Sequence, residues 1–210
     1  MITIMIAASR YSRAAGSMLH VCSMSTPDEL WVFGYGSLMW RPGFEYLDST
    51  PAKLTGLHRA LCVYSFVHRG TPEKPGLVLG LDRGGACKGV AFRVAGKHRD
   101  VTVRYLRDRE QVTSVYLETH RLVDLLDGSG KRVRALMYCV DRGHVQYAGK
   151  LSLEQQLHLV RSAHGRSGAN PDYVASTVEA LEALGIRDRD LHYLAQSLKG
   201  SHDPATTGAP

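Results

Sequence analysis

Short hydrophobic stretches separated by turn residues occupy the first two thirds of the chain and predict strands. Each stretch is bounded by Gly, Pro or charged residues, which is typical of short strands in a sheet. The predicted strands span residues 30–33, 60–66, 77–81, 88–94 and 134–140, with 115–123 as a further candidate. The segment 97–109 interrupts this pattern, because Val101, Tyr105 and Leu106 are spaced to share one face of a helix.

The last third of the chain carries residues that begin and end helices. Ser152 and Gln155 form a capping-box pattern at the start of one predicted helix. Asn170 is expected to cap a second helix, which has Pro171 at its first position and ends at Gly185. We find no internal repeat and no interdomain linker. Strands followed by helices therefore predict a single α+β domain over residues 28–199.

The two ends of the chain differ from this domain. Residues 1–27 contain Arg10 and Arg13 but no acidic residue, and they are expected to form a disordered extension. This composition is typical of an organelle transit peptide, but we favour an upstream start codon, with Met18 or Met24 as the natural first residue. The tail over residues 200–210 is small and polar, and is also predicted to be disordered.

Composition narrows the possible partners. Hydrophobic residues make up 44% of the chain and charged residues 22%, as in ordinary globular proteins. The formal charge of +6 favours anions. The basic residues are spread along the chain, however, so we expect no nucleic-acid partner. No apolar run is long enough to span a membrane, so we do not expect a membrane as a partner. A small anionic metabolite fits this balance.

Cysteine and histidine positions argue against disulfides and metals. The four cysteines lie far apart without a C-x-x-C pair, and three of them stand in apolar stretches. They are therefore predicted to be free thiols in a reducing compartment, which indicates a cytoplasmic protein. The ten histidines are scattered, and none is spaced with Cys or carboxylates as metal ligands are. We predict no metal site; the oligomeric state is left open.

The stretch WVFGYGSLMW (residues 31–40) ends a predicted strand with two glycines and a serine. A dinucleotide-binding fingerprint would need glycine in place of Met39. A nucleophile elbow around Ser37 would need glycine in place of both Tyr35 and Met39. Two readings remain. The loop is either a plain glycine-rich turn, or a nest of backbone N–H groups that binds an anion.

A second candidate feature lies at the end of the predicted helix. Glu110 stands between that helix and the next apolar stretch. Taken alone, it is best explained as a solvated helix-end carboxylate paired with Arg107 or Arg109.

Five segments, in order, resemble the ChaC-like γ-glutamylcyclotransferases, in particular the glutathione-specific branch. The resemblance extends from about Leu30 to about Lys199. One position departs from the pattern, since Ser114 stands where relatives often have glycine. The segments are VFGYGSLMWRPGFEY (32–46), HRGTPEKPG (68–76), REQVTSVY (109–116), QYAG (146–149) and GRSGANPDY (165–173).

The resemblance implies a fold, an activity and a set of site residues. It implies a mixed β-barrel flanked by helices, and an enzyme that cleaves glutathione to 5-oxoproline and Cys-Gly without a cofactor. Glu110 would be the catalytic acid and base. Tyrosines and arginines in the similar segments are further binding candidates, although each is also explained by packing or by surface ion pairs. The implied substrate-binding residues are Val32, Phe33, Gly34, Tyr35, Gly36, Ser37 and Leu38, with Tyr116, Tyr147 and Tyr173 as tyrosine candidates and Arg69 and Arg166 as candidates for the glycine carboxylate.

The implied chemistry is reasonable in its own terms. The α-amine of a γ-glutamyl group can attack its own γ-carbonyl and close a five-membered lactam. Well-oriented intramolecular attack is worth roughly 7–11 kcal/mol. One carboxylate can take the proton from the amine and give it to the leaving nitrogen. Because a free glutamate with a pKa of about 4.3 is a poor acid, the site is expected to raise that pKa by burial.

Two other functions are compatible with the sequence. One is a cyclotransferase that acts on other γ-glutamyl amines or amino acids. The other is a non-catalytic binding module with the same pocket. The presence of both Glu110 and the glycine loop argues against the second, because mere binding does not require a carboxylate at that position.

Overall fold

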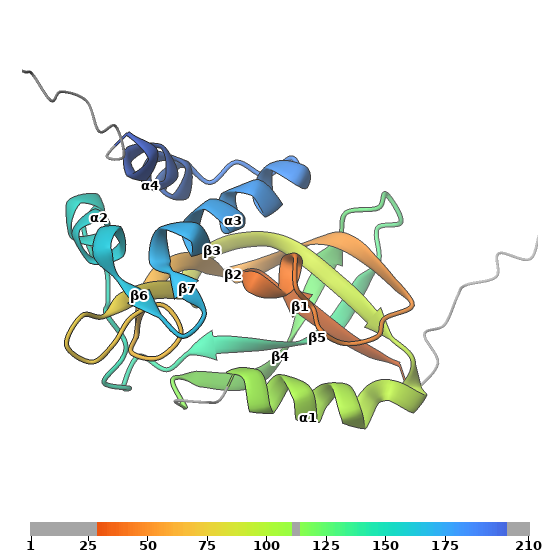
Figure 1. Cartoon of the computed structure of the whole chain (residues 1–210). Helices are drawn as coiled ribbons and strands as arrows, with labels where there is room; N and C mark the ends of the chain where they lie inside the picture. Colours follow the sequence, from red (N-terminus) through yellow and green to blue (C-terminus); the bar gives the residue numbers. More distant parts are fainter. Residues whose placement is uncertain (1–28, 111–113, 201–210) are drawn as a thin grey trace, which may run out of the picture.

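A computed structural model describes residues 29–110 and 114–200 of the chain. Within these ranges the strands close into a barrel in the spatial order β1-β3-β2-β4-β5 (Figure 1). All pairs are antiparallel except β1 with β5, whose parallel pairing closes the barrel. The strands are β1 (Leu30–Gly34), β2 (Asp48–Ser65), β3 (Gly76–Val94), β4 (Tyr116–Leu125) and β5 (Arg132–Val140).

Two of the strands are much longer than the sequence indicated. The prediction was wrong to separate residues 77–81 from 88–94, and to leave 48–59 outside any strand. Gly84 and Gly85 both have positive φ, which in isolation indicates a turn. In the structure, pairing with β2 carries β3 through these glycines, and the register shifts there by a bulge. Tertiary pairing therefore overrides the local turn signal.

Helices lie on two opposite sides of the barrel. Figure 1 shows α1 along one side and the other three helices gathered on the opposite side. No helix in the described ranges is long and apolar enough to cross a membrane. The helices are α1 (Arg99–Glu110), α2 (Leu153–Ser162), α3 (Asn170–Ala183) and α4 (Arg189–Lys199), with short 3₁₀ turns η1 (Ser37–Met39) and η2 (Gly96–His98) and a two-stranded ribbon of β6 (His164–Gly165) and β7 (Gly168–Ala169).

The helix-capping predictions were confirmed at two positions and wrong at a third. Both hydrogen bonds of the Ser152–Gln155 capping box are formed. Gly185 follows α3 with a φ of 65°. Asn170, however, is not the cap of α3: it is the first helical residue, and its side-chain amide bonds instead to the backbone of Leu77. The local pattern did not reveal this partner, which is 93 residues away in the sequence.

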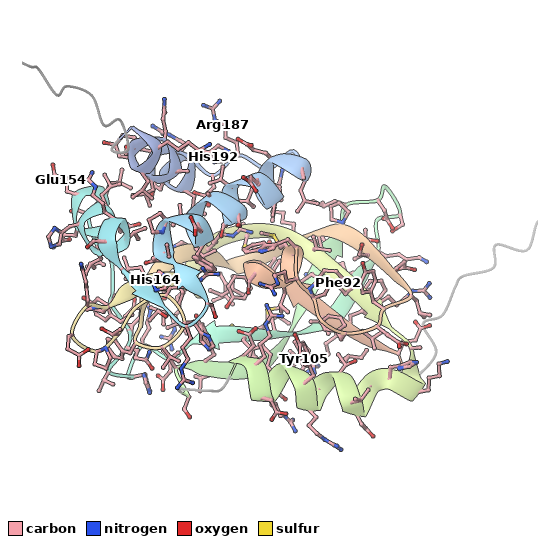
Figure 2. The ribbon with its side chains drawn as sticks, in the orientation of Figure 1. Phe92, Tyr105, Glu154, His164, Arg187 and His192 are labelled. Atoms are coloured by element: carbon pink, nitrogen blue, oxygen red, sulfur yellow. The ribbon has the colours of Figure 1, made fainter. Side chains whose placement is uncertain are left out.

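Two buried clusters connect the barrel to its helices. Because side chains alternate along a strand, neighbouring residues of β1 enter different clusters. Phe33 joins the cluster that reaches α2, α3 and α4, whereas Val32 joins the cluster closed by Leu106 of α1. Figure 2 shows Tyr105 between α1 and the barrel, on the side where Phe92 lies. The loop after β1 therefore leaves the barrel from a strand that is buried on both faces.

The prediction of free thiols can be checked in the described ranges, whereas those for the two ends of the chain cannot. Cys62, Cys87 and Cys139 are free thiols, as expected. The extension over residues 1–27 and the tail from residue 201 lie outside the described residues, as do the three middle residues of REQVTSVY (111–113).

Candidate active site

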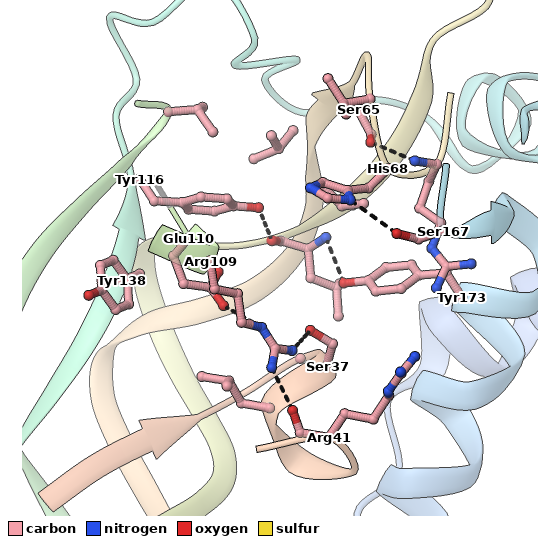
Figure 3. Close-up of a pocket in the computed structure, with 18 of the residues that line it drawn as sticks. Ser37, Arg41, Ser65, His68, Arg109, Glu110, Tyr116, Tyr138, Ser167 and Tyr173 are labelled. Carbon is pink, nitrogen blue, oxygen red and sulfur yellow. Dashed lines mark hydrogen bonds and ion pairs between the residues drawn. The ribbon is translucent and has the colours of Figure 1, made fainter. Parts of the chain in front are cut away.

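A cavity of about 560 Å³ opens where β1 ends, between the loop after β1, the end of α1 and the start of α3 (Figure 3). Its walls contain most of the residues that the sequence singled out. The predicted site residues that line it are Phe33, Tyr35, Gly36, Ser37, Leu38, Arg69, Glu110, Tyr116 and Tyr173.

Four predicted residues lie elsewhere. Val32 and Gly34 do not line the cavity. Arg166 is exposed and is also not among the lining residues. Tyr147 donates a 2.9 Å hydrogen bond to the carboxylate of Asp82, outside the cavity. These four are therefore not brought into contact with the cavity.

The glycines of the loop after β1 have different physical roles. A Cβ at Gly34 would lie 3.1 Å from the Cβ of Leu38 and 3.2 Å from the Phe92 ring, closer than well-packed atoms normally approach. A Cβ at Gly36 would lie 3.5 Å from the Tyr173 hydroxyl and 3.6 Å from Leu79, which is ordinary contact. Gly34 is thus needed for packing under the loop, whereas Gly36 keeps space free beside Tyr173.

Side chains complete one edge of β3 at the cavity. β1 pairs with β3 only from Val90 to Val94, so residues 77–79 have no strand on that side. Asn170 accepts from the Leu77 N–H and donates to its carbonyl. At Leu79, the N–H donates to the Tyr173 hydroxyl at 3.2 Å, and the carbonyl accepts from the Tyr116 hydroxyl at 2.7 Å. Three side chains therefore replace a missing strand, as buried backbone groups require.

Glu110 is largely buried at the end of α1. Its side chain is 18% exposed, and Oε1 lies 3.2 Å from Nε of Arg109. Burial raises the pKa of Glu110, and the Arg109 cation opposes that rise. This is the direction of the pKa shift that was expected from the sequence. Arg107, the other suggested partner, pairs with Glu118 instead at 2.7 Å.

The Glu110 carboxyl lines the same cavity as three tyrosine hydroxyls. Its charge contributes to the raised pKa of the Tyr35, Tyr116 and Tyr173 hydroxyls, although burial is the largest cause in each. All three phenols therefore stay protonated near neutral pH, and can donate hydrogen bonds. Figure 3 shows Tyr116 and Tyr173 entering from opposite sides, with Glu110 below Tyr116 and the guanidinium of Arg109 below both tyrosines.

Arg109 connects Glu110 to the loop after β1. Its guanidinium donates to the Ser37 hydroxyl at 2.8 Å and to the Arg41 carbonyl at 2.6 Å, besides the contact with Glu110. It also reaches the Tyr105 hydroxyl at 2.9 Å. From the sequence, Arg109 was expected only as an ion-pair partner of Glu110. Its bonds to the loop join residues about 70 positions apart, and no local pattern indicates them.

Arg59 was not indicated by any sequence pattern, yet it holds the loop after β1 in place. Its side chain is 4% exposed and lies 3.8 Å from Asp188. Nε donates to the Tyr35 carbonyl at 2.6 Å, and an Nη donates to the Lys88 carbonyl at 2.7 Å. Arg59 lies in the part of β2 that was not predicted as a strand, so no sequence pattern indicated its role.

Arginines outnumber acidic residues in the lining of the cavity, which contains Arg41, Arg69 and Arg109 beside Asp108 and Glu110. Arg41 and Arg69 line it, and Arg69 lies over the Tyr173 ring at 5.4 Å while donating to the Ala169 carbonyl. His68 also lines it and contacts the Ser167 hydroxyl at 3.0 Å. A ligand carrying carboxylates suits this rim. Among the described residues, no group of three or more His, Cys, Asp or Glu side chains could hold a metal ion.

Ser114 adopts the backbone conformation that its position in the motif suggests. Its φ of 56° lies in the left-handed region, and it is the one non-glycine residue with positive φ in the described ranges. Glycine adopts that conformation without steric cost, whereas the Cβ of serine makes it unfavourable.

Comparisons with known proteins find one matching family model, similar sequences and a similar fold. The family model described as ChaC-like protein matches residues 30–200. A glutathione-specific gamma-glutamylcyclotransferase of Escherichia coli K12 is 37% identical over 175 residues, covering 82% of this chain and 75% of that protein. Glutathione-specific gamma-glutamylcyclotransferase 1 of Homo sapiens is 32% identical over 171 residues, covering 80% and 77%. A crystal structure of a yeast gamma-glutamyl cyclotransferase specific to glutathione matches with a TM-score of 0.75 at 23% identity, covering 83% and 97%.

Proposed function

The chain belongs to the ChaC-like protein family, and from this premise we propose that it is a glutathione-specific γ-glutamylcyclotransferase. The reaction cleaves glutathione to 5-oxoproline and Cys-Gly. The observation that carries the proposal is the placement of Glu110, which lines the same cavity as the loop after β1 and is bound to it through Arg109.

Glu110 is the proton carrier in this scheme. Starting from the neutral α-amine, the nitrogen attacks the γ-carbonyl carbon as the Glu110 carboxylate takes one of its protons. The tetrahedral intermediate then re-forms the carbonyl and breaks the bond to the cysteinyl nitrogen, which receives the proton from Glu110. The carboxylate is regenerated and nothing is oxidised or reduced. The raised pKa of Glu110 supports the second step, because it makes the acid more readily available near neutral pH.

The loop after β1 is the proposed binding site for the γ-glutamyl end. The backbone at Gly36 and the hydroxyl of Ser37 are on the cavity wall and have polar groups that suit a carboxylate. Phe33, Leu38 and the ring of Tyr116 supply apolar wall around the reacting atoms. Both reacting groups belong to one molecule, so the scheme needs no cofactor.

Glutathione fits the charge and size of the site better than a γ-glutamyl amine does. Its two carboxylates match a rim that includes Arg41 and Arg69. The volume of about 560 Å³ lies within the range typical of small-molecule sites. The free thiols at Cys62, Cys87 and Cys139 support a reducing compartment, and we propose a cytoplasmic location on that basis.

The test is to incubate the purified protein separately with glutathione, γ-glutamyl-alanine and γ-glutamyl-lysine, and to measure 5-oxoproline. We expect product from glutathione with a kcat/KM at least about tenfold above the other two. All three compounds carry two carboxylates, but only glutathione has its second one on a glycine, one residue beyond the amino acid on the γ-amide, and one well-made charged contact at that distance supplies the margin. Preference for γ-glutamyl-alanine or γ-glutamyl-lysine would favour a cyclotransferase of other specificity. Binding of glutathione without 5-oxoproline would indicate a non-catalytic module.

A further inference from the structure

The hydroxyl of Tyr173 is buried with its hydrogen uncommitted. Its oxygen accepts a 3.2 Å hydrogen bond from the N–H of Leu79. A phenol also carries one hydrogen to donate. No acceptor for that hydrogen is found among the described residues. Tyr116 has the opposite arrangement on the same residue, because its hydrogen is donated to the Leu79 carbonyl at 2.7 Å.

The uncommitted hydrogen faces the space where substrate would react. The Tyr173 hydroxyl lies 3.5 Å from where a Cβ on Gly36 would stand, so no protein atom fills the gap between hydroxyl and loop. Glu110 lines the same cavity, and its charge acts on the Tyr173 hydroxyl. Figure 3 shows the hydroxyl of Tyr173 pointing toward the centre of the cavity, away from α3.

The ring of Tyr173 is held in place from several directions. The guanidinium of Arg69 lies 5.4 Å from its ring centre, and Trp40 packs against it at 6.2 Å. The side chain is almost fully buried at the start of α3. A donor held this firmly needs no reorganisation when charge develops near it, which is the condition for effective stabilisation of an oxyanion.

We propose that Tyr173 donates a hydrogen bond to the γ-carbonyl oxygen of the substrate, and so stabilises the negative charge that this oxygen gains. The inference rests on the proposed cyclotransferase activity. When the α-amine attacks, the electron pair of the carbonyl π bond moves to the oxygen, and the Tyr173 O–H bonds to it without transferring its proton. When the carbonyl re-forms, that electron pair returns and the cysteinyl nitrogen leaves with the proton from Glu110. Tyr173 is unchanged at the end.

The acid–base state of Tyr173 suits this role. Burial raises the pKa of Tyr173 to about 12, so the phenol keeps its hydrogen at neutral pH. The N–H of Leu79, bonded to the same oxygen, polarises the O–H bond and makes it a stronger donor. Because Tyr116 donates its hydrogen to the Leu79 carbonyl, it lacks this capacity, although it lines the same cavity.

Tyr173→Phe and Tyr116→Phe form a matched pair for the test. Each removes one hydroxyl and leaves one backbone group of the same residue, Leu79, without its partner. Kinetics with glutathione and thermal unfolding are measured for both. We expect Tyr173→Phe to lower kcat roughly 100-fold, the usual effect of losing one oxyanion donor, with KM changed less than about threefold. Tyr116→Phe is expected to lower kcat less than about tenfold, with a similar loss in Tm.

A third variant separates hydrogen donation from the fit of the ring. 3-Fluorotyrosine at position 173 retains the hydroxyl and makes it more acidic, so we expect kcat at or above that of the wild type. A loss of kcat equal to that of Tyr173→Phe would overturn the proposal, as would equal losses in the two Phe variants or full kcat in Tyr173→Phe. These results leave the cyclotransferase proposal standing, since that depends on whether the wild-type protein forms 5-oxoproline.

Discussion

Arg109 donates a 2.8 Å hydrogen bond to the hydroxyl of Ser37, so the residue next to Glu110 is bound directly to the loop after β1. α1 and β1 are thereby held in a fixed relation at the cavity, although they are about 70 residues apart in the chain. The proposed base and the proposed binding loop are positioned together by a single guanidinium.

Replacing Arg109 should change the pH dependence of the reaction. In Arg109→Gln the cation that opposes burial is lost, so the pKa of Glu110 rises further. As pH falls, the carboxylate form of Glu110 is therefore lost at a higher pH than in the wild type. The acid limb of the kcat/KM profile moves to higher pH as a result. Arg109→Lys keeps the positive charge but lacks the forked guanidinium that donates to Ser37. We expect its acid limb to stay near that of the wild type, while kcat falls roughly 10–100-fold.

Arg107→Gln is the matched control, because Arg107 lies on the same helix, is 55% exposed and pairs with Glu118 away from the cavity. Its profile should be that of the wild type. An unmoved acid limb in Arg109→Gln would mean that Arg109 does not act on the proposed base.

Burial of Glu110 is predicted to cost stability. Its raised pKa means that the folded protein binds this proton more tightly than the unfolded chain does. The wild type therefore loses stability as pH rises from the ordinary glutamate pKa of 4.5 through the raised value, whereas Glu110→Gln does not. At pH 8 the variant should have a Tm higher by roughly 2–4 °C, and the difference should vanish near pH 4. A Tm difference independent of pH would contradict a buried, titrating carboxyl.

Gly36→Ala should affect binding more than folding. The added methyl group meets Tyr173 and Leu79 at ordinary contact distances, so Tm is expected to change by less than about 4 °C. The same group occupies space beside the proposed reacting atoms, and KM for glutathione should rise at least about tenfold. Gly34→Ala, two residues earlier, should show the reverse, because its methyl group is forced against Leu38 and Phe92. An unchanged KM in Gly36→Ala would remove the loop from the binding site.

Ser114→Gly should stabilise the protein. The φ of 56° at Ser114 is costly for a residue with a Cβ and costs glycine little. We expect the free energy of unfolding to increase by about 0.5–1 kcal/mol, measured by urea denaturation with an unchanged m-value. A decrease would show that Ser114 makes interactions that outweigh its backbone cost.

Features fixed by neighbours in sequence were the predictable ones. The capping box at Ser152 and the glycine after α3 each depend on residues within one turn, so the local pattern was sufficient. The first half of β2 was not predicted, for the opposite reason. Its exposed, mixed residues have no strand pattern of their own, and only pairing with β3 makes them a strand. α4 was missed as well, although Asp188 caps it.

The candidate site divides in the same way. Glu110 and the loop after β1 were indicated by ordered motifs, and the raised pKa of Glu110 was expected from the chemistry of the proposed reaction. The supporting contacts of Arg59 and Arg109 were not predictable, because their partners are set by the closure of the barrel. Tyr147 shows that a motif can also mislead. It belongs to one of the five segments that resemble the family, yet it bonds to Asp82 outside the cavity.

The central claim, that Glu110 carries the proton in an intramolecular cyclisation, is tested most directly by the rate of 5-oxoproline formation from glutathione in Glu110→Gln. Glutamine keeps the size of the side chain and cannot act as base or acid. The account predicts a rate lower by roughly 10²–10⁴-fold, with circular dichroism showing an intact fold. A rate near that of the wild type in the folded variant would contradict it.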